Sequence, residues 1–472
     1  MQSSRVAATL RAGVDLLLRN GTIVTAAETY KADVGIEGGT IKQIGLGLGD
    51  AAKTIDASGK YLFPGGIDVH THVDLEEHLL GHGTVDDFYS STAAAACGGV
   101  TTIVDYAFPA EGQGLQDALE AWIRKGTGKS VIDYGLHPVI RDPTDEVIAE
   151  MADVVAEGFT SFKIFTTALG RFDELASRYL KAIKEAGRLN ALTNIHCEDQ
   201  CCIDFITREL DDAGKAGSVR HYPDSRPREA EGLAAQRAVR MAGLADAPVY
   251  LVHLSCEEAL QALDDARGRG QTVFGETRPL YLHLTREAYD GDDFPERYTC
   301  WPPLRETEQV EIIWQALESD VLQTVATDHI AWSKAQKLHG KRVDEFLPGM
   351  ANLETLLPML YSDGVRTGRL SLNRFVEVSS TNPAKLFGLY PRKGTIAVGS
   401  DADIVVFDPE KKVVIRQADM HSRQDWELHE GFETTGWPVF TISRGEVIVE
   451  DRQLLASPGR GELVKRKPFG SI

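Results

Sequence analysis

The hydrophobic positions of this chain follow one pattern at its two ends and another in its middle. Between residues 15 and 44, short apolar runs alternate with polar turn residues, and Asn20-Gly21 and Gly38-Gly39 are typical of hairpin turns. A similar series lies between residues 394 and 449. The predicted strands cover residues 16–18, 21–25, 32–36, 40–44, 402–407, 412–415, 439–443 and 446–449. Two β-rich ends that flank one long middle predict a small β-sandwich formed by both termini.

The middle of the chain alternates between strand-like apolar runs and amphipathic helical patterns. Several runs are almost continuously apolar, which is typical of parallel strands buried on both faces. The predicted strands cover residues 65–74, 100–106, 131–137, 161–165, 190–195, 249–253, 272–276 and 324–328. The predicted helices cover residues 86–97, 115–125, 145–157, 172–186, 228–242, 257–267, 306–318 and 353–360. Eight strand–helix units in this order predict an α/β fold, a (β/α)8 TIM-type barrel with insertions.

These patterns divide the chain into four segments. We expect residues 1–64 to form the N-terminal part of the β-sandwich domain, and residues 65–390 to form the barrel. Residues 391–450 would complete the sandwich, and residues 451–472 would form a C-terminal tail. The basic end of this tail is compatible with an intersubunit arm or with a loose solvated segment.

Composition narrows the class of protein. The chain has 472 residues, of which 43% are hydrophobic and 25% charged, as in soluble globular proteins. Its formal net charge of −20 argues against nucleic acid or an anionic membrane as a partner. No apolar run approaches the roughly 20 residues that a membrane span needs. The first dozen residues have a poor apolar region for a targeting signal and are expected to be a frayed leader.

The six cysteines are scattered along the chain, so a disulfide framework is not expected and a reducing cytoplasm is the default location. Cys197, Cys201 and Cys202 lie near a histidine, but their spacing does not match a structural zinc site. We therefore expect these three side chains to be buried small hydrophobes.

Two histidines, His70 and His72, stand two positions apart in the strand-like stretch that follows Pro64. Residues i and i+2 of a strand face the same side, so both imidazoles point at one place, as a metal ion requires. The pair alone is equally compatible with two histidines that share a strand by chance.

Four further polar residues lie within or at the ends of later strands, and a barrel would bring them together. His196 ends the fifth predicted strand, His253 the sixth and Asp328 the eighth. The chemistry of such barrels lies at the C-terminal ends of the strands. Taken singly, a histidine could be only a hydrogen-bonded polar residue, and Asp328 could be a helix cap.

Lys163 lies in the fourth predicted strand between Phe162 and Phe165. A bare ammonium group is costly to bury in such a strand. The side chain could reach solvent, pair with a carboxylate, or react with carbon dioxide to form a carbamate. A carbamate is an anion and could bridge two cations.

The order His70-x-His72, Lys163, His196, His253, Asp328 resembles that of the amidohydrolase superfamily, and most of all its hydantoinase/dihydropyrimidinase branch. The likeness covers nearly the whole chain. Supporting stretches are Phe63-Pro64-Gly65-Gly66-Ile67-Asp68, Gly99-Val100-Thr101-Thr102, Ser225-Arg226-Pro227, Gly275-Glu276-Thr277, Pro302-Pro303-Leu304-Arg305, Asn382-Pro383-Ala384 and Gly399-Ser400-Asp401-Ala402-Asp403.

The resemblance implies a site for two divalent metal ions, usually Zn²⁺. His70, His72 and Asp328 would hold one ion, His196 and His253 the other, and Lys163 carbamylated by carbon dioxide would bridge them. Asp328 would also position the attacking hydroxide and carry its proton. The implied reaction opens one C–N bond of a small cyclic amide, imide or ureide of the hydantoin or dihydropyrimidine kind. Members of the branch are commonly homo-oligomers, tetramers or dimers.

Three positions depart from the pattern of the branch. Ala168 replaces a tyrosine whose hydroxyl stabilises the oxyanion, so Thr166, Thr167 or a metal ion would have to serve instead. Trp301 replaces a serine, and Pro348 replaces an asparagine and cannot donate an N–H. Trp301 suggests a bulky, aromatic-walled pocket.

Two other functions stay open on the sequence alone. One is hydrolysis of a linear amide or of an allantoin-like ureide. The other is a non-catalytic scaffold of the same fold, although relatives of that kind have lost metal ligands and all six positions are filled here.

Overall fold

The computed structural model describes residues 14–167, 171–291 and 293–469. The expected leader at residues 1–12 and the departure at Ala168 lie outside the described residues.

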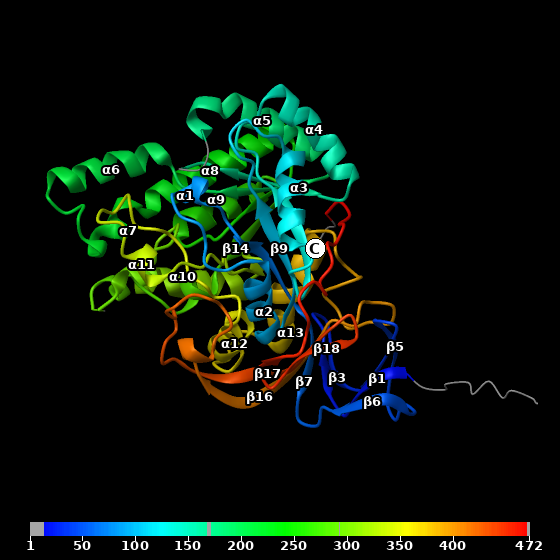
Figure 1. Cartoon of the computed structure of the whole chain (residues 1–472). Coiled ribbons are helices and arrows are strands. Elements are labelled where there is room, and N and C mark those ends of the chain that lie inside the picture. Colours follow the sequence, from blue (N-terminus) through cyan, green and yellow to red (C-terminus); the bar gives the residue numbers. More distant parts are fainter. Residues whose placement is uncertain (1–13, 168–170, 292, 470–472) are drawn as a thin grey trace, which may run out of the picture.

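Eight parallel strands form the barrel (Figure 1). The strands β8 to β10 make one sheet and β11 to β15 make another, and parallel bridges at Val139–Lys163 and Thr71–His329 join their edges. The strands are β8 Gly66–Thr71, β9 Val100–Ala107, β10 Asp133–Pro138, β11 Ser161–Phe165, β12 Leu192–His196, β13 Val249–Leu251, β14 Val273–Thr277 and β15 Thr324–Val325. All their residues are buried, as the continuous apolar runs predict. The predicted barrel is confirmed.

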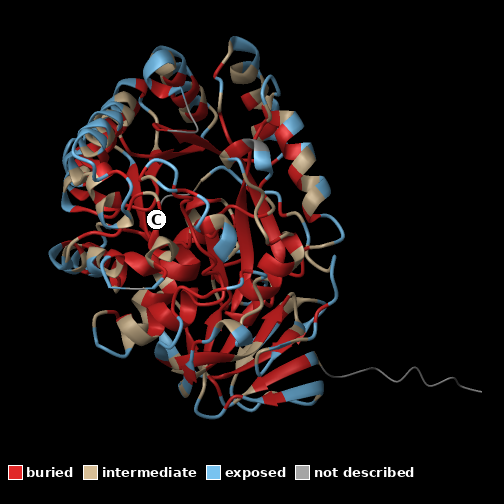
Figure 2. Ribbon diagram, turned by 60° about the vertical axis from the view of Figure 1, so that its left-hand side comes forward, coloured by how far each residue is buried: buried red, intermediate tan, exposed pale blue. Residues whose placement is uncertain are grey.

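Helices follow the strands and cover the outside of the barrel, with buried inner and exposed outer faces (Figure 2). The longer ones are α2 Phe88–Cys97, α3 Leu115–Gly126, α4 Asp145–Ala156, α5 Phe172–Arg188, α6 Gln200–Asp212, α8 Arg228–Ala245, α9 Glu257–Gly268 and α10 Thr307–Glu318. Short helices are α1 Glu77–Leu80, α7 Tyr222–Ser225, α11 Lys334–Lys337, α12 Leu356–Leu360, α13 Leu372–Val376 and α14 Asn382–Leu386. None of the helices in the described part of the chain is long and apolar enough to cross a membrane.

Two smaller sheets combine strands from both ends of the chain, and Figure 1 shows them below the barrel. One has the order β5-β4-β1-β6 and the other the order β19-β18-β17-β16-β7-β2-β3. The N-terminal strand β7 pairs antiparallel with the C-terminal strand β16, so the two ends share one sheet. The strands are β1 Val14–Arg19, β2 Thr22–Val24, β3 Thr29–Lys31, β4 Asp33–Glu37, β5 Thr40–Gly45, β6 Ala51–Asp56, β7 Tyr61–Pro64, β16 Ile404–Val414, β17 Glu433–Ser443, β18 Glu446–Glu450 and β19 Gln453–Leu454. The division at residues 64, 390 and 450 stays a prediction.

The structure differs from the sequence prediction in several elements, among them β3 and β6, which were not predicted. The predicted strands 402–407 and 412–415 are one strand, β16, which continues through register shifts between Val406 and Lys412. The helix α6 was not predicted, although Ile203, Ile206 and Leu210 repeat at helical spacing in this segment. The last barrel strand is shorter than predicted and ends at Val325.

The C-terminal segment packs beside β10. The backbone N–H of Tyr134 donates to the carbonyl of Glu462, and the N–H of Val464 donates to the carbonyl of Tyr134. Val464 and Arg466 are buried. The segment up to residue 469 is therefore part of the packed structure and not a loose solvated tail. The expectation for the cysteines was partly wrong, because Cys201 is exposed on α6 and Cys202 is half-buried there.

Candidate metal centre

The six predicted site residues come from five strands and gather at one end of the barrel. His70 lies in β8 and His72 directly after Thr71, the last residue of that strand. His196 ends β12, while His253 and Asp328 follow β13 and β15 by two and three residues. Lys163 is the middle residue of β11. The barrel thus brings together residues that are up to 258 positions apart (328 − 70).

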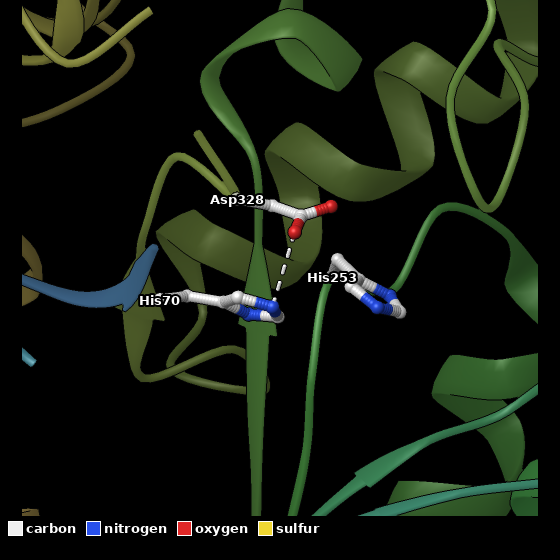
Figure 3. A group of neighbouring side chains, drawn as sticks. All are labelled: His70, His253 and Asp328. Carbon is white, nitrogen blue, oxygen red and sulfur yellow. Dashed lines mark ion pairs between the residues drawn. The ribbon is translucent and has the colours of Figure 1, made fainter. Parts of the chain in front are cut away.

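The side chains meet in two groups. Oδ1 of Asp328 lies 3.2 Å from Nε2 of His70 and 2.9 Å from Nε2 of His72. Nδ1 of His196 lies 2.9 Å from Nε2 of His253. Asp328 and His70 face each other and His253 lies beside them (Figure 3), and one ligand atom of each lies within 4.8 Å of the others. His253 therefore connects the two groups.

Lys163 is fully buried, and its Nζ has no hydrogen-bond partner among the described residues. The Nζ lies 4.7 Å from the ring centre of Tyr106 and 4.8 Å from that of Phe165. Burial lowers the pKa of Lys163 to about 8. A larger fraction of this amine is therefore unprotonated near neutral pH than in an exposed lysine, and the unprotonated form is the one that reacts with carbon dioxide.

Burial also keeps most of the histidines neutral. It lowers the pKa of His72 to about 4 and the pKa of His253 well below its usual value. The pKa of His196 is lowered by burial as well. A neutral imidazole has the free lone pair that a metal ion needs. Nε2 of His70 is also buried and lies 3.2 Å from Oδ1 of Asp328.

Two glutamates orient the histidines. Oε1 of Glu276 lies 2.7 Å from Nδ1 of His70, and Oε2 of Glu198 lies 2.9 Å from Nε2 of His196. Each carboxylate accepts a hydrogen bond from the N–H of one ring nitrogen, so the other nitrogen (Nε2 of His70, Nδ1 of His196) carries the lone pair that faces the site. Sequence reasoning did not assign these roles. The available signals were a glutamate at the end of the seventh barrel strand and a His-x-Glu sequence at residues 196–198.

Arg278 is a further buried residue of the site that sequence reasoning missed. Its Nη1 lies 3.1 Å from Oδ2 of Asp328, and its Nε donates to the carbonyl of Thr327. Burial alone would raise the pKa of Asp328, but the charge of Arg278 and the contacts with His70 and His72 lower it well below its usual value. Asp328 is therefore ionised and has one oxygen toward the histidines and the other toward Arg278.

The backbone around the site is held in unusual conformations. Asp328 has a φ of 52° and His253 a φ of 43°, in the left-handed region that non-glycine residues seldom occupy. The N–H of Asp328 donates to the carbonyl of His70, and the N–H of His72 donates to the carbonyl of His329. These bonds tie the end of β8 to the turn that carries Asp328.

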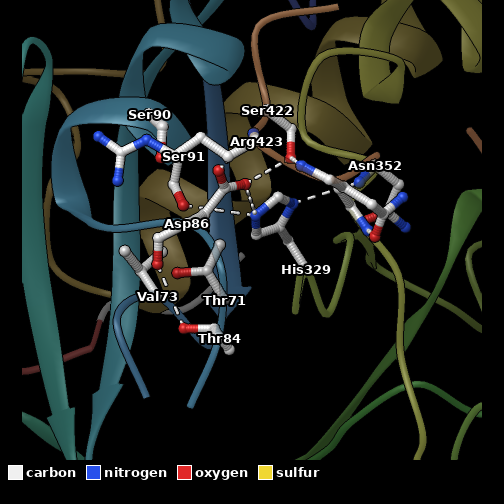
Figure 4. A network of polar contacts seen from close by, with 12 residues as sticks. Thr71, Val73, Thr84, Asp86, Ser90, Ser91, His329, Asn352, Ser422 and Arg423 are labelled. Carbon is white, nitrogen blue, oxygen red and sulfur yellow. Dashed lines mark hydrogen bonds and ion pairs between the residues drawn. The ribbon is translucent and has the colours of Figure 1, made fainter. Parts of the chain in front are cut away.

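His329 anchors the same turn from behind (Figure 4). Its Nδ1 accepts from the N–H of Asn352, and its Nε2 lies 3.4 Å from Oδ2 of Asp86. Asp86 in turn accepts from the hydroxyl of Ser422 and the N–H of Arg423. A segment from beyond the barrel thus helps to fix the turn next to Asp328.

A recess of about 500 Å³, including its open mouth, leads to these residues. Four of the predicted site residues line it: His72, His196, His253 and Asp328. Its other walls are mainly apolar and comprise Leu75, Leu79, Leu80, Phe108, Phe165, Trp301, Ile330, Pro348 and Gly349. Trp301 and Pro348, two of the three departures from the expected pattern, therefore face the space where a small molecule would bind.

Comparison with known proteins agrees with this geometry. Residues 61–448 match the model of the amidohydrolase family. The chain belongs to the amidohydrolase family and, within it, to the hydantoinase/dihydropyrimidinase-like branch. It is 41% identical to a D-hydantoinase of Ralstonia pickettii over 97% of this chain and 100% of the relative. It is 38% identical to a D-phenylhydantoinase of Escherichia coli over 96% and 98% of the two chains. The crystal structure of a dihydropyrimidinase from Brevibacillus agri superimposes with a TM-score of 0.93 at 41% identity, covering 97% of this chain and 99% of that one.

Proposed function

We propose that this protein is a binuclear metal-dependent hydrolase that opens one C–N bond of a cyclic amide, imide or ureide. Its small-molecule substrate would be a hydantoin or a dihydropyrimidine. The observation that carries the proposal is the gathering of four histidines, Asp328 and Lys163 at the end of one barrel, with a buried Nζ of Lys163 that has no hydrogen-bond partner among the described residues. The names of the relatives support the substrate class.

His70, His72 and Asp328 would hold one divalent ion, and His196 and His253 would hold the other. Lys163, as a carbamate, would bridge them. Zn²⁺ is the proposed metal because tetrahedral sites rich in imidazole suit it. Two bound ions of this kind supply a hydroxide near neutral pH and polarise a carbonyl group. The buried Nζ of Lys163, which has no hydrogen-bond partner among the described residues, supports this assignment.

The side chains of the chain would perform the remaining steps. Asp328 would accept the proton of the attacking water and deliver it to the leaving nitrogen. Arg278 would keep the carboxylate in one orientation through its contact with Oδ2. The apolar walls of the recess would exclude bulk water and bind the part of the substrate that does not react.

A substrate panel tests this proposal. The chain is loaded with Zn²⁺ in the presence of bicarbonate and assayed with hydantoins, dihydropyrimidines, allantoin and linear amides. We expect ring opening of hydantoins or dihydropyrimidines, with little activity in a Lys163→Met variant. Turnover of only allantoin or linear amides would support the alternative hydrolase, and no turnover by a fully metal-loaded chain would support the scaffold.

We also propose that the protein works as a cytoplasmic homo-oligomer, a tetramer or a dimer. The free cysteines are compatible with a reducing compartment. Light scattering of the purified chain measures the oligomeric state directly.

A further inference from the structure

Trp301 stands between two hollows of the molecule. One is the recess that leads to the candidate metal centre. The other is an open outer cleft of about 1090 Å³, lined by residues of α6 such as Gln200 and Asp204 and by the cations Arg208, Arg226 and Arg342. Among the described residues that line either hollow, Trp301 is the only one that lines both. The indole therefore forms the wall between an apolar and a polar space.

Arg226 supports this wall from the side of the outer cleft. Its guanidinium carbon lies 4.3 Å from the ring centre of Trp301, a cation–π distance. Its Nη1 lies 2.5 Å from Oε2 of Glu198, the same oxygen that accepts from Nε2 of His196. Burial alone would raise the pKa of Glu198, but Arg226 and His196 lower it to about 2. The guanidinium group of Arg226 is thus held by an ionised carboxylate and packs against the indole of Trp301.

The other residues that line the recess beside Trp301 are mostly apolar. Leu75, Leu79, Phe108 and Ile330 are apolar and offer no charge to a substituent on the substrate ring. Arg226 lines the outer cleft and does not line the recess. Without the indole, which the guanidinium of Arg226 packs against, this cation would no longer be covered on the side of the recess.

We propose that Trp301 is a specificity-determining residue that selects ring substrates with an apolar, aryl-sized substituent and screens the charge of Arg226 from them. This inference rests on the proposed function, because it assigns the substituent of that substrate. Removal of the indole would open the recess into the outer cleft and expose a guanidinium. The altered site would favour substrates that carry a carboxylate on the substituent.

The test compares two hydantoins, one with a phenyl and one with a carboxymethyl substituent, on metal-loaded wild type and on Trp301→Ala. We expect the ratio of kcat/KM for phenyl over carboxymethyl to fall at least about tenfold, mainly through KM, as expected for a changed pocket contact. Trp301→Phe keeps a ring and should keep the ratio within about threefold. Any rise in kcat/KM for the carboxymethyl substrate in Trp301→Ala should be absent from the double variant Trp301→Ala/Arg226→Met.

Phe205→Ala is the matched control, because Phe205 is an exposed aromatic residue of α6 that lines neither hollow. It should leave the ratio unchanged. An unchanged ratio in folded, metal-loaded Trp301→Ala would overturn the inference. If that variant does not fold, Trp301→Leu takes its place, with the same expected fall.

Failure of the proposed function gives a different result. In that case metal-loaded wild type opens neither hydantoin. The wall is then tested by calorimetric binding of the two ring-opened N-carbamoyl amino acids to wild type and Trp301→Ala. A weaker preference for the phenyl compound in Trp301→Ala than in wild type would retain the assignment of Trp301. The same preference in both proteins would reject it.

Discussion

Arg278 and Asp328 form an ion pair at the candidate metal centre. Nη1 of Arg278 lies 3.1 Å from Oδ2 of Asp328, and the arginine side chain has no exposed surface. The pair leaves Oδ1 of Asp328 directed at His70 and His72. Arg278 therefore acts as a positioning residue, which sets the direction of a carboxylate that lies on a strained turn.

Replacement of Arg278 tests this relationship. We expect Arg278→Gln to lower kcat about 10- to 100-fold, the range found when partners behind a metal site are removed. KM should change less, because Arg278 does not line the recess. Arg278→Lys keeps the charge and should recover part of the rate. Equal rates in wild type and Arg278→Gln would show that the ion pair does not orient Asp328.

Glu276 offers a test of how the histidines are oriented. Its Oε1 lies 2.7 Å from Nδ1 of His70 and also accepts from the N–H of His253. Glu276→Gln removes the charge and should weaken metal binding about 10- to 100-fold, as measured by competition with a chelator. Glu231→Gln changes another buried glutamate, which bonds to Ser255 and Arg305 instead. That control should lower stability without a comparable change in metal affinity.

Lys393 holds the barrel and the smaller sheets together at a distance from the recess. Its Nζ lies 2.8 Å from Oδ2 of Asp133, at the start of β10, and 2.6 Å from Oδ2 of Asp403, beside β16. All three side chains are buried. Lys393→Met leaves the carboxylates without this cation and should lower the free energy of unfolding by about 3–5 kcal/mol.

Urea unfolding followed by circular dichroism measures this loss. The double variant Lys393→Met/Asp403→Asn should recover part of it, because one unpaired charge is removed. The folded single variant should keep its kcat, since Asp133 lies at the barrel end away from the site. A loss below about 1 kcal/mol would place the cluster among ion pairs of little net effect.

His421 predicts a pH dependence of stability. Its hydrogen bond with Glu354 raises its pKa above the usual value, although burial opposes the shift. The charged form is therefore favoured in the folded state. The contribution of His421 to the free energy of unfolding is complete below the unfolded pKa of about 6.5. It is lost as the pH rises through the folded pKa.

We therefore expect His421→Asn to cost about 1 kcal/mol at pH 6, a typical value for a hydrogen bond, and less at pH 8. Thermal unfolding at the two pH values measures the difference. Glu354→Gln should remove the same pH dependence, and the double variant should add nothing further. A His421→Asn variant with the same loss at both pH values would contradict the assignment.

The sequence allowed the barrel and the six candidate ligands to be predicted because both depend on local signals. Continuous apolar runs mark buried parallel strands, and the polar residues stand within or near the ends of those runs. The order of His70, Lys163 and Asp328 along the chain matched a known family, which supplied the roles that single residues could not.

The roles of Glu198, Glu276 and Arg278 could not be predicted in this way. Glu276 is 206 residues from His70, and their contact exists only once the barrel has closed. Arg278 directly follows β14, and its burial against Asp328 depends on the turn after β15. The packing of Arg226 on Trp301 joins two loops 75 residues apart (301 − 226) and has no signal in either segment.

The most direct test of the account is the metal content of the purified chain together with its intact mass under mild conditions. We predict about two Zn²⁺ per chain and a mass increment equal to one carbamate, which disappears in Lys163→Met. No bound metal after supplementation with Zn²⁺ and bicarbonate would contradict the binuclear site. It would leave a scaffold of the amidohydrolase fold and a buried Lys163 without a role in chemistry.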